Sequence, residues 1–201
     1  MIAMTDTETQ TPEMSDRLKK EKVGRDLMWL GLSSMAIFFG GLTSAYIVRM
    51  NGGNWKDIAL PAQFYISTAL ILFSSVTLNA ALSAVKKGNS PAKFVLLTLI
   101  LGMGFAVFQF LGWRSLNHAG IYFTGKQSIA SGQYLYVLTW AHLMHMLAGL
   151  ISVGIVTVKA SQGKYTADNY NGMRICAIFW HFLDVLWIYL FLFLLFVRYI
   201  A

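Results

Sequence analysis

Five long runs of apolar residues, separated by short polar segments, make up most of the chain. The runs cover about residues 27–48, 62–85, 94–113, 134–158 and 175–197. A helix needs about 20 residues to cross a bilayer, at a rise of about 1.5 Å per residue, and each run has that length. The sequence has 16 Lys and Arg and 9 Asp and Glu residues, and among these Asp184 alone falls inside a run. The pattern predicts an all-α, polytopic membrane protein with a bundle of five transmembrane helices.

The segment ahead of the first run has a different character. Residues 1–26 are rich in Thr, Glu, Asp and Lys and contain no aromatic residue. They are typical of a polar tail rather than of a folded domain. The loops between the runs are too short to hold a second domain. We therefore expect a polar cytoplasmic tail over 1–26 and one transmembrane bundle over 27–201.

Composition supports the membrane assignment and excludes several other classes. The apolar set AVILMFWYC makes up 56% of the chain and charged residues only 12%, whereas soluble domains average about 25% charged residues. Cys176 is the single cysteine, so no internal disulfide can form. Without a CxxC motif or a Cys/His cluster, zinc and iron–sulfur sites of the soluble kind are excluded as well.

The net charge of +7 is explained by membrane topology. Five crossings put the two ends of the chain on opposite sides, and one side has 11 basic residues: Arg17, Lys19, Lys20, Lys22, Arg25, Lys86, Lys87, Lys93, Lys159, Lys164 and Arg174. The other side has 5, namely Arg49, Lys56, Arg114, Lys126 and Arg198. The positive-inside rule then predicts a cytoplasmic N-terminus and a periplasmic C-terminus. No nucleic-acid partner is needed to explain the charge.

Ionisable residues inside the spans are the candidate functional groups. A charged side chain at a helix centre costs about 2.5–3.5 kcal/mol on insertion scales, so such residues mark functional candidates. Asp184 lies near the middle of the fifth span, and His181 lies three residues earlier on the same helical face. Trp180 and Trp187, two turns apart, line a neighbouring stripe. In the fourth span His142 and His145 repeat the spacing of three.

Three interpretations compete for these four polar residues. They could be metal or haem ligands, although their spacing does not match a metalloprotease helix. They could form a short proton relay. The interpretation we favour is that they hydrogen-bond across helices and hold the bundle together, because lipid supplies no hydrophobic force between helices. We accordingly expect no catalytic, cofactor-binding or metal-binding residue in this chain.

Three segments resemble one known family. Residues 180–187 read WHFLDVLW, which resembles the W-H-F-x-D-x-x-W signature of subunit III of the haem–copper oxidases. Residues 139–149 read TWAHLMHMLAG and are similar to the family's T-G-x-H-x-x-H-V-x-x-G segment, in the right order and at the right distance upstream. The first span, with Ser34, Phe38, Phe39 and Gly41, looks like the family's S-E/D-x-x-x-F-x-x-G helix. The resemblance covers about residues 27–199.

The chain departs from the family pattern in two places. The long form of subunit III has seven helices, whereas this chain resembles the short five-helix bacterial form that begins at the third. Met35 stands after Ser34, where the family has an acidic residue. No role that needs a carboxyl group at that position carries over to this chain.

The resemblance implies an accessory subunit of a bacterial terminal oxidase, a cytochrome c oxidase of the inner membrane. Such a subunit is non-catalytic. It packs against subunit I, where the haem and copper lie, touches other oxidase subunits, binds phospholipid, and supports proton uptake and the stability of the complex. The accessory subunit of a nitric oxide reductase or of a quinol oxidase is the alternative within the family. A small membrane transporter, or a membrane haem protein acting alone, is the alternative from another class.

Overall fold

The computed structural model describes residues 12–50, 55–167 and 169–200, with side chains described over 22–50, 55–167 and 169–197. These residues form five α-helices: α1 (Pro12–Met50), α2 (Ala62–Lys86), α3 (Ala92–His118), α4 (Ala130–Ser161) and α5 (Asn171–Ile200). Each helix contains one of the five apolar runs and is long and apolar enough to cross a membrane. Within the described ranges there is no β-strand, only an isolated bridge between Thr166 and Asn169. The prediction of an all-α, five-helix membrane protein is confirmed.

The first helix is longer than the apolar run it contains. It begins at Pro12, so the second part of the segment expected to be a polar tail is helical and continues without a break into the first span. Residues 1–11 of that segment lie outside the described residues.

Proline and glycine mark the helix ends. Pro61 precedes α2 and Pro91 precedes α3, where the missing N–H is not needed by the helix. The second residue after α2, α3 and α4 is a glycine with positive φ: Gly88 (76°), Gly120 (78°) and Gly163 (68°). Behind each of them the next N–H bonds back to a carbonyl of the last turn, as Asn89 does to Ala84 at 2.9 Å. All three ends are therefore Schellman caps, a conformation in which any side chain beyond hydrogen is strained.

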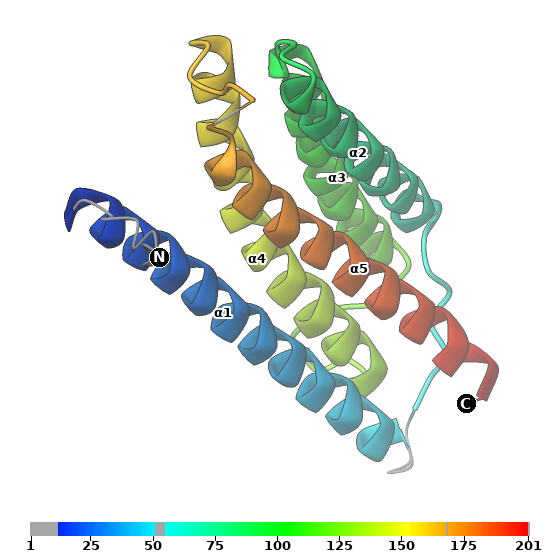
Figure 1. Cartoon of the computed structure of the whole chain (residues 1–201). Helices are drawn as coiled ribbons and strands as arrows, with labels where there is room; N and C mark the ends of the chain where they lie inside the picture. The colour runs from blue at the N-terminus through cyan, green and yellow to red at the C-terminus, as the bar shows by residue number, and fades with distance from the viewer. Residues whose placement is uncertain (1–11, 51–54, 168, 201) are drawn as a thin grey trace, which may run out of the picture.

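Helices α2, α3, α4 and α5 form a ring in which each contacts the next, and α1 lies along one side of this ring. In Figure 1, α2 and α3 run side by side and α5 crosses in front of α4; α4 also packs against α3, and α5 contacts α2. The first helix contacts α4 and α5 only. Each contact buries the apolar face of a helix, and α4 and α5 each pack against three others.

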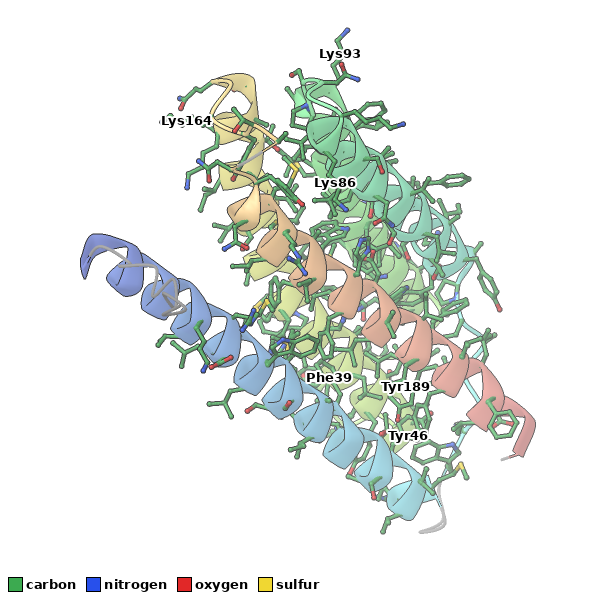
Figure 2. All side chains as sticks on the ribbon, viewed as in Figure 1. Phe39, Tyr46, Lys86, Lys93, Lys164 and Tyr189 are labelled. Atoms are coloured by element: carbon green, nitrogen blue, oxygen red, sulfur yellow. The ribbon has the colours of Figure 1, made fainter. Side chains whose placement is uncertain are left out.

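The core is rich in aromatic side chains, and the basic residues lie at the ends. Trp180 and Trp187 on α5 are fully buried, together with Phe39 of α1, Phe64 of α2 and Phe105 of α3. Lys86, Lys93 and Lys164, all assigned above to the basic side, lie at the same end of the bundle (Figure 2). The large exposed side chains on the outside of the spans are mostly apolar, as a lipid-facing surface requires.

Candidate functional site

The contact between α2 and α5 carries most of the polar groups that the sequence singled out. The indole N–H of Trp180 donates to the Ser74 hydroxyl at 2.9 Å, and that of Trp187 donates to the Thr68 hydroxyl at the same distance. Both tryptophans lie on the α2 side of α5 because seven residues make almost two full turns. Each buried indole thus has its hydrogen-bond partner on the neighbouring helix.

The His181 and Asp184 pair lies in the same contact. Nδ1 of His181 is 2.6 Å from the Ser75 hydroxyl, and Nε2 is 3.2 Å from Oδ1 of Asn79. Both ring nitrogens are used when the Ser75 hydroxyl donates to Nδ1 and the Nε2–H donates to Asn79. Oδ2 of Asp184 lies 3.9 Å from Nδ1, so the spacing of three residues does bring the pair together. Neither carboxyl oxygen has a hydrogen-bond partner among the described residues.

The second pair, His142 and His145, behaves differently. His142 is fully buried, and its ring packs among those of Phe39, Phe105 and Trp187, at centroid distances of 6.3, 5.9 and 5.1 Å. Within the described part of the chain neither of its nitrogens forms a hydrogen bond. Nδ1 of His145 donates to the carbonyl of Ala141, one turn earlier in the same helix, at 2.8 Å.

The interpretation that all four polar residues hydrogen-bond across helices therefore holds for His181 alone, and it is wrong for the α4 pair and for Asp184. The helices opposite α4 present aromatic rings at that level instead of hydroxyl or amide groups. His142 and His145 contribute ring packing, whereas His181 forms the hydrogen bonds to a neighbouring helix that were expected.

The described residues give no support to a metal centre. Among them, no three His, Cys, Asp or Glu side chains lie close enough together to hold an ion. Met35, which replaces the acidic residue of the family pattern, is partly buried and packs against the apolar core.

Several polar residues that sequence reasoning missed form buried contacts between helices. The amide of Gln109 donates to the Ser67 hydroxyl at 2.9 Å, and the indole of Trp113 donates to the Thr139 hydroxyl at 3.0 Å. The Tyr189 hydroxyl lies 2.8 Å from that of Thr43 and links α5 to α1. The sequence did contain one indication of these contacts. Ser67 and Ser74 are seven residues apart on α2, and this spacing places both on one face of the helix.

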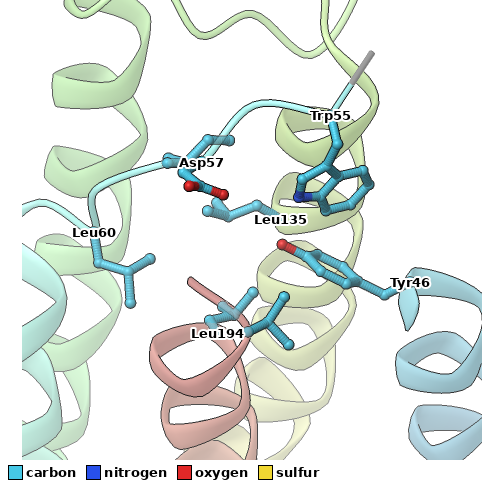
Figure 3. Close-up of a pocket in the computed structure, with 8 residues that line it drawn as sticks. Tyr46, Trp55, Asp57, Leu60, Leu135 and Leu194 are labelled. Atoms are coloured by element: carbon cyan, nitrogen blue, oxygen red, sulfur yellow. The ribbon is translucent and has the colours of Figure 1, made fainter. Parts of the chain in front are cut away.

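Two cavities lined by described residues differ in size and opening. A small cavity between α1, α4, α5 and the segment 55–60, lined by Tyr46, Asp57, Leu135 and others, has a volume of about 10 Å³ (Figure 3). That is room for a single water molecule. A larger apolar hollow of about 640 Å³ opens beside α3 and α4 and is lined by Trp113, Asn117, Phe123, Tyr136, Val137, Trp140 and Ala141.

Comparison with known proteins decides the family. The family model described as cytochrome c oxidase subunit III matches residues 32–199, which is nearly the whole bundle. This chain belongs to the cytochrome c oxidase subunit III family. It is a non-catalytic, multi-pass membrane subunit of a haem–copper oxidase complex.

Relatives of this subunit III chain are found across bacteria. It is 31% identical to the cytochrome c oxidase subunit 3 of Corynebacterium diphtheriae, over 83% of this chain and 84% of that protein. It is 29% identical to the probable cytochrome c oxidase subunit 3 of Nocardia farcinica, over 94% of each chain. The cytochrome c oxidase subunit 3 of Thermostichus vulcanus shares 27% identity over 80% of both chains. The match extends along nearly the full length of these relatives, so the resemblance inferred from three motifs is confirmed.

Proposed function

We propose that this chain is the accessory third subunit of a bacterial cytochrome c oxidase, packed on the catalytic subunit I, and that it supports proton uptake and the stability of the complex. The observation that carries the proposal is the family match over residues 32–199. The haem and copper belong, in this proposal, to subunit I. The polar groups of the described core agree with such a role, because they hydrogen-bond between helices or lie unpartnered in the packed interior.

Bound phospholipid is part of the same proposal. The hollow of about 640 Å³ beside α3 and α4 is open and is lined almost entirely by aromatic and aliphatic groups. An acyl chain is the apolar molecule that a bilayer offers to such a surface. Asn117 and the Tyr136 hydroxyl, which lie 3.0 Å apart, form its polar edge toward the loop after α3.

The test is to purify the complex by an affinity tag on the C-terminus of this chain, after extraction in mild detergent. We expect a large haem- and copper-containing subunit to co-purify, and the preparation to take up oxygen when reduced cytochrome c is added. Uptake driven by quinol instead would make the complex a quinol oxidase, and reduction of nitric oxide would make it a nitric oxide reductase. A colourless chain recovered alone, from cells whose oxidases survive the extraction, would contradict the proposal.

A second expected result concerns orientation in the inner membrane. A cysteine introduced at Ser128 should react with a membrane-impermeant thiol reagent added to spheroplasts, whereas one at Ser161 should react only after the membrane is permeabilised. The two serines lie near opposite ends of α4, and the basic end of the bundle is expected to face the cytoplasm. Cys176 is buried and is replaced by serine in both variants and in the control. The reverse labelling pattern would overturn the proposed topology.

A further inference from the structure

One surface of the bundle exposes polar groups at a depth where lipid cannot bind them. His181 is 30% exposed and Asn79 is exposed. They lie about 5 and 8 Å along the helix axis from the middles of their spans, at about 1.5 Å per residue. The hydrocarbon core extends about 15 Å to each side of its midplane, so both side chains are within it. Hydrocarbon offers no hydrogen-bond partner, and an unsatisfied polar group there costs free energy.

The hydrogen bonds of this pair leave donors unused. Oδ1 of Asn79 accepts from Nε2 of His181, and no described residue accepts a hydrogen bond from the Asn79 amide nitrogen. Behind the pair, Asp184 is 3% exposed and its carboxyl oxygens have no hydrogen-bond partner within the described ranges. The polar cluster therefore has hydrogen-bonding capacity that the described residues do not satisfy.

The exposed residues around the cluster form two neighbouring stripes with a spacing of seven. We call this surface the α2–α5 face; it consists of Tyr65, Leu72 and Asn79 on α2 and of Val185, Leu192 and the partly buried Ile178 on α5. A spacing of seven keeps the residues of a helix in one line, which is the arrangement that packs against another helix. The two stripes are adjacent because His181 bonds to α2 and the rings of Tyr65 and Phe191 are in contact.

The α2–α5 face is bordered along α5 by an apolar hollow. Figure 1 shows α5 running between α1 and α2, and no described contact joins α1 to α2. Further along α5 an apolar hollow of about 490 Å³ is lined by Tyr189, Leu192, Phe193, Leu195 and Phe196. All of these lining residues belong to α5, and Leu192 is also part of the α2–α5 face.

The outward surface of α3 provides the contrast. Between Phe94 and Leu111 its large exposed side chains are all apolar, and the polar Gln109 in this stretch is buried. Lipid alone can cover that surface, because no exposed polar side chain in this stretch needs a hydrogen-bond partner.

We propose that the α2–α5 face is covered by a transmembrane helix of another oxidase subunit, which offers a hydrogen-bond acceptor to the Asn79 amide. The inference rests on the proposed function, since it assigns the surface by which the chain joins its complex. A backbone carbonyl, a hydroxyl or a carboxylate at that depth can accept a hydrogen bond from the Asn79 amide, whereas an acyl chain cannot.

The test uses the tagged full chain, expressed with the other oxidase subunits, and measures the haem recovered per chain. Leu72→Trp and Val185→Trp each enlarge an exposed side chain on the α2–α5 face, and we expect each to lower the recovered haem about tenfold or more. Val107→Trp, on the outward surface of α3, is the matched control and should leave it unchanged. Asn79→Leu makes the isolated chain more compatible with lipid, so the chain should accumulate normally while the recovered haem falls about threefold to tenfold.

The outcomes separate the two proposals. If the unaltered chain recovers the oxidase and the tryptophan and leucine substitutions on the α2–α5 face do not change the yield, this surface faces lipid and the inference is wrong. If the recovered haem falls only in the Val107→Trp variant, the interface lies on α3 and the inference is wrong. If even the unaltered chain recovers no haem, the proposed function itself fails, and the docking surface with it.

Discussion

Trp180→Ala is expected to lower the free energy of unfolding of this subunit by about 3–5 kcal/mol, the usual cost of deleting a large buried aromatic side chain. The Trp180 side chain is completely buried and reaches three other helices. Its indole N–H bonds to Ser74 of α2, and its ring packs against Gly102 of α3 and Gly149 of α4. The substitution leaves a cavity at the point where four helices meet and removes the hydrogen bond that the Ser74 hydroxyl accepts from α5.

The measurement is denaturant unfolding of the purified chain in mixed micelles, followed by circular dichroism. Trp140→Ala is the matched control, because Trp140 is 52% exposed on the outside of α4 and its removal leaves no internal cavity. Equal destabilisation by both substitutions would show that Trp180 is not the packing centre of the bundle.

Gly102→Val is the second substitution with a large expected effect. A Cβ atom added at Gly102 would lie 2.5 Å from Cη2 of Trp180 and 2.9 Å from Cδ2 of Leu150, closer than side chains approach one another. The rigid indole cannot withdraw, since its N–H is held by Ser74 and its Cε3 and Cζ3 atoms lie against Gly149. We expect a loss of about 1–3 kcal/mol or more from overpacking, with α3 displaced from α5.

The control for this substitution is Gly154→Val on α4, where an added Cβ meets nothing within 4 Å. It introduces the same β-branched residue into a helix, so any intrinsic helix effect is shared. A double-mutant cycle with Trp180→Phe sharpens the test, because a smaller ring should relieve part of the Gly102→Val clash. Strict additivity of the two substitutions would contradict a direct contact.

Hydrogen bonding inside the bundle was only partly predictable from the sequence. The His181 and Asp184 pair was identified because both residues are ionisable, lie within a span and are three residues apart. The spacing of His142 and His145 is the same, yet these residues pack against aromatic rings and form no hydrogen bond to another helix. Nothing in the α4 sequence distinguishes the two cases, because the difference lies in the residues of α1, α3 and α5 that happen to face them.

The sequence by itself determined the five spans, the all-helical class and the family of this protein. Those properties are local: a run of about 20 apolar residues forms a helix in lipid because every backbone group must be satisfied within the segment. The tertiary structure alone decided which side chains meet. Between α2 and α5 it pairs Ser74 with Trp180, Thr68 with Trp187 and Ser75 with His181. It also decided that Asn79 and His181 stay exposed on one face while Asp184 is enclosed. The physical reason is that helical periodicity assigns a residue to a face, whereas the neighbour of that face depends on how separate helices pack.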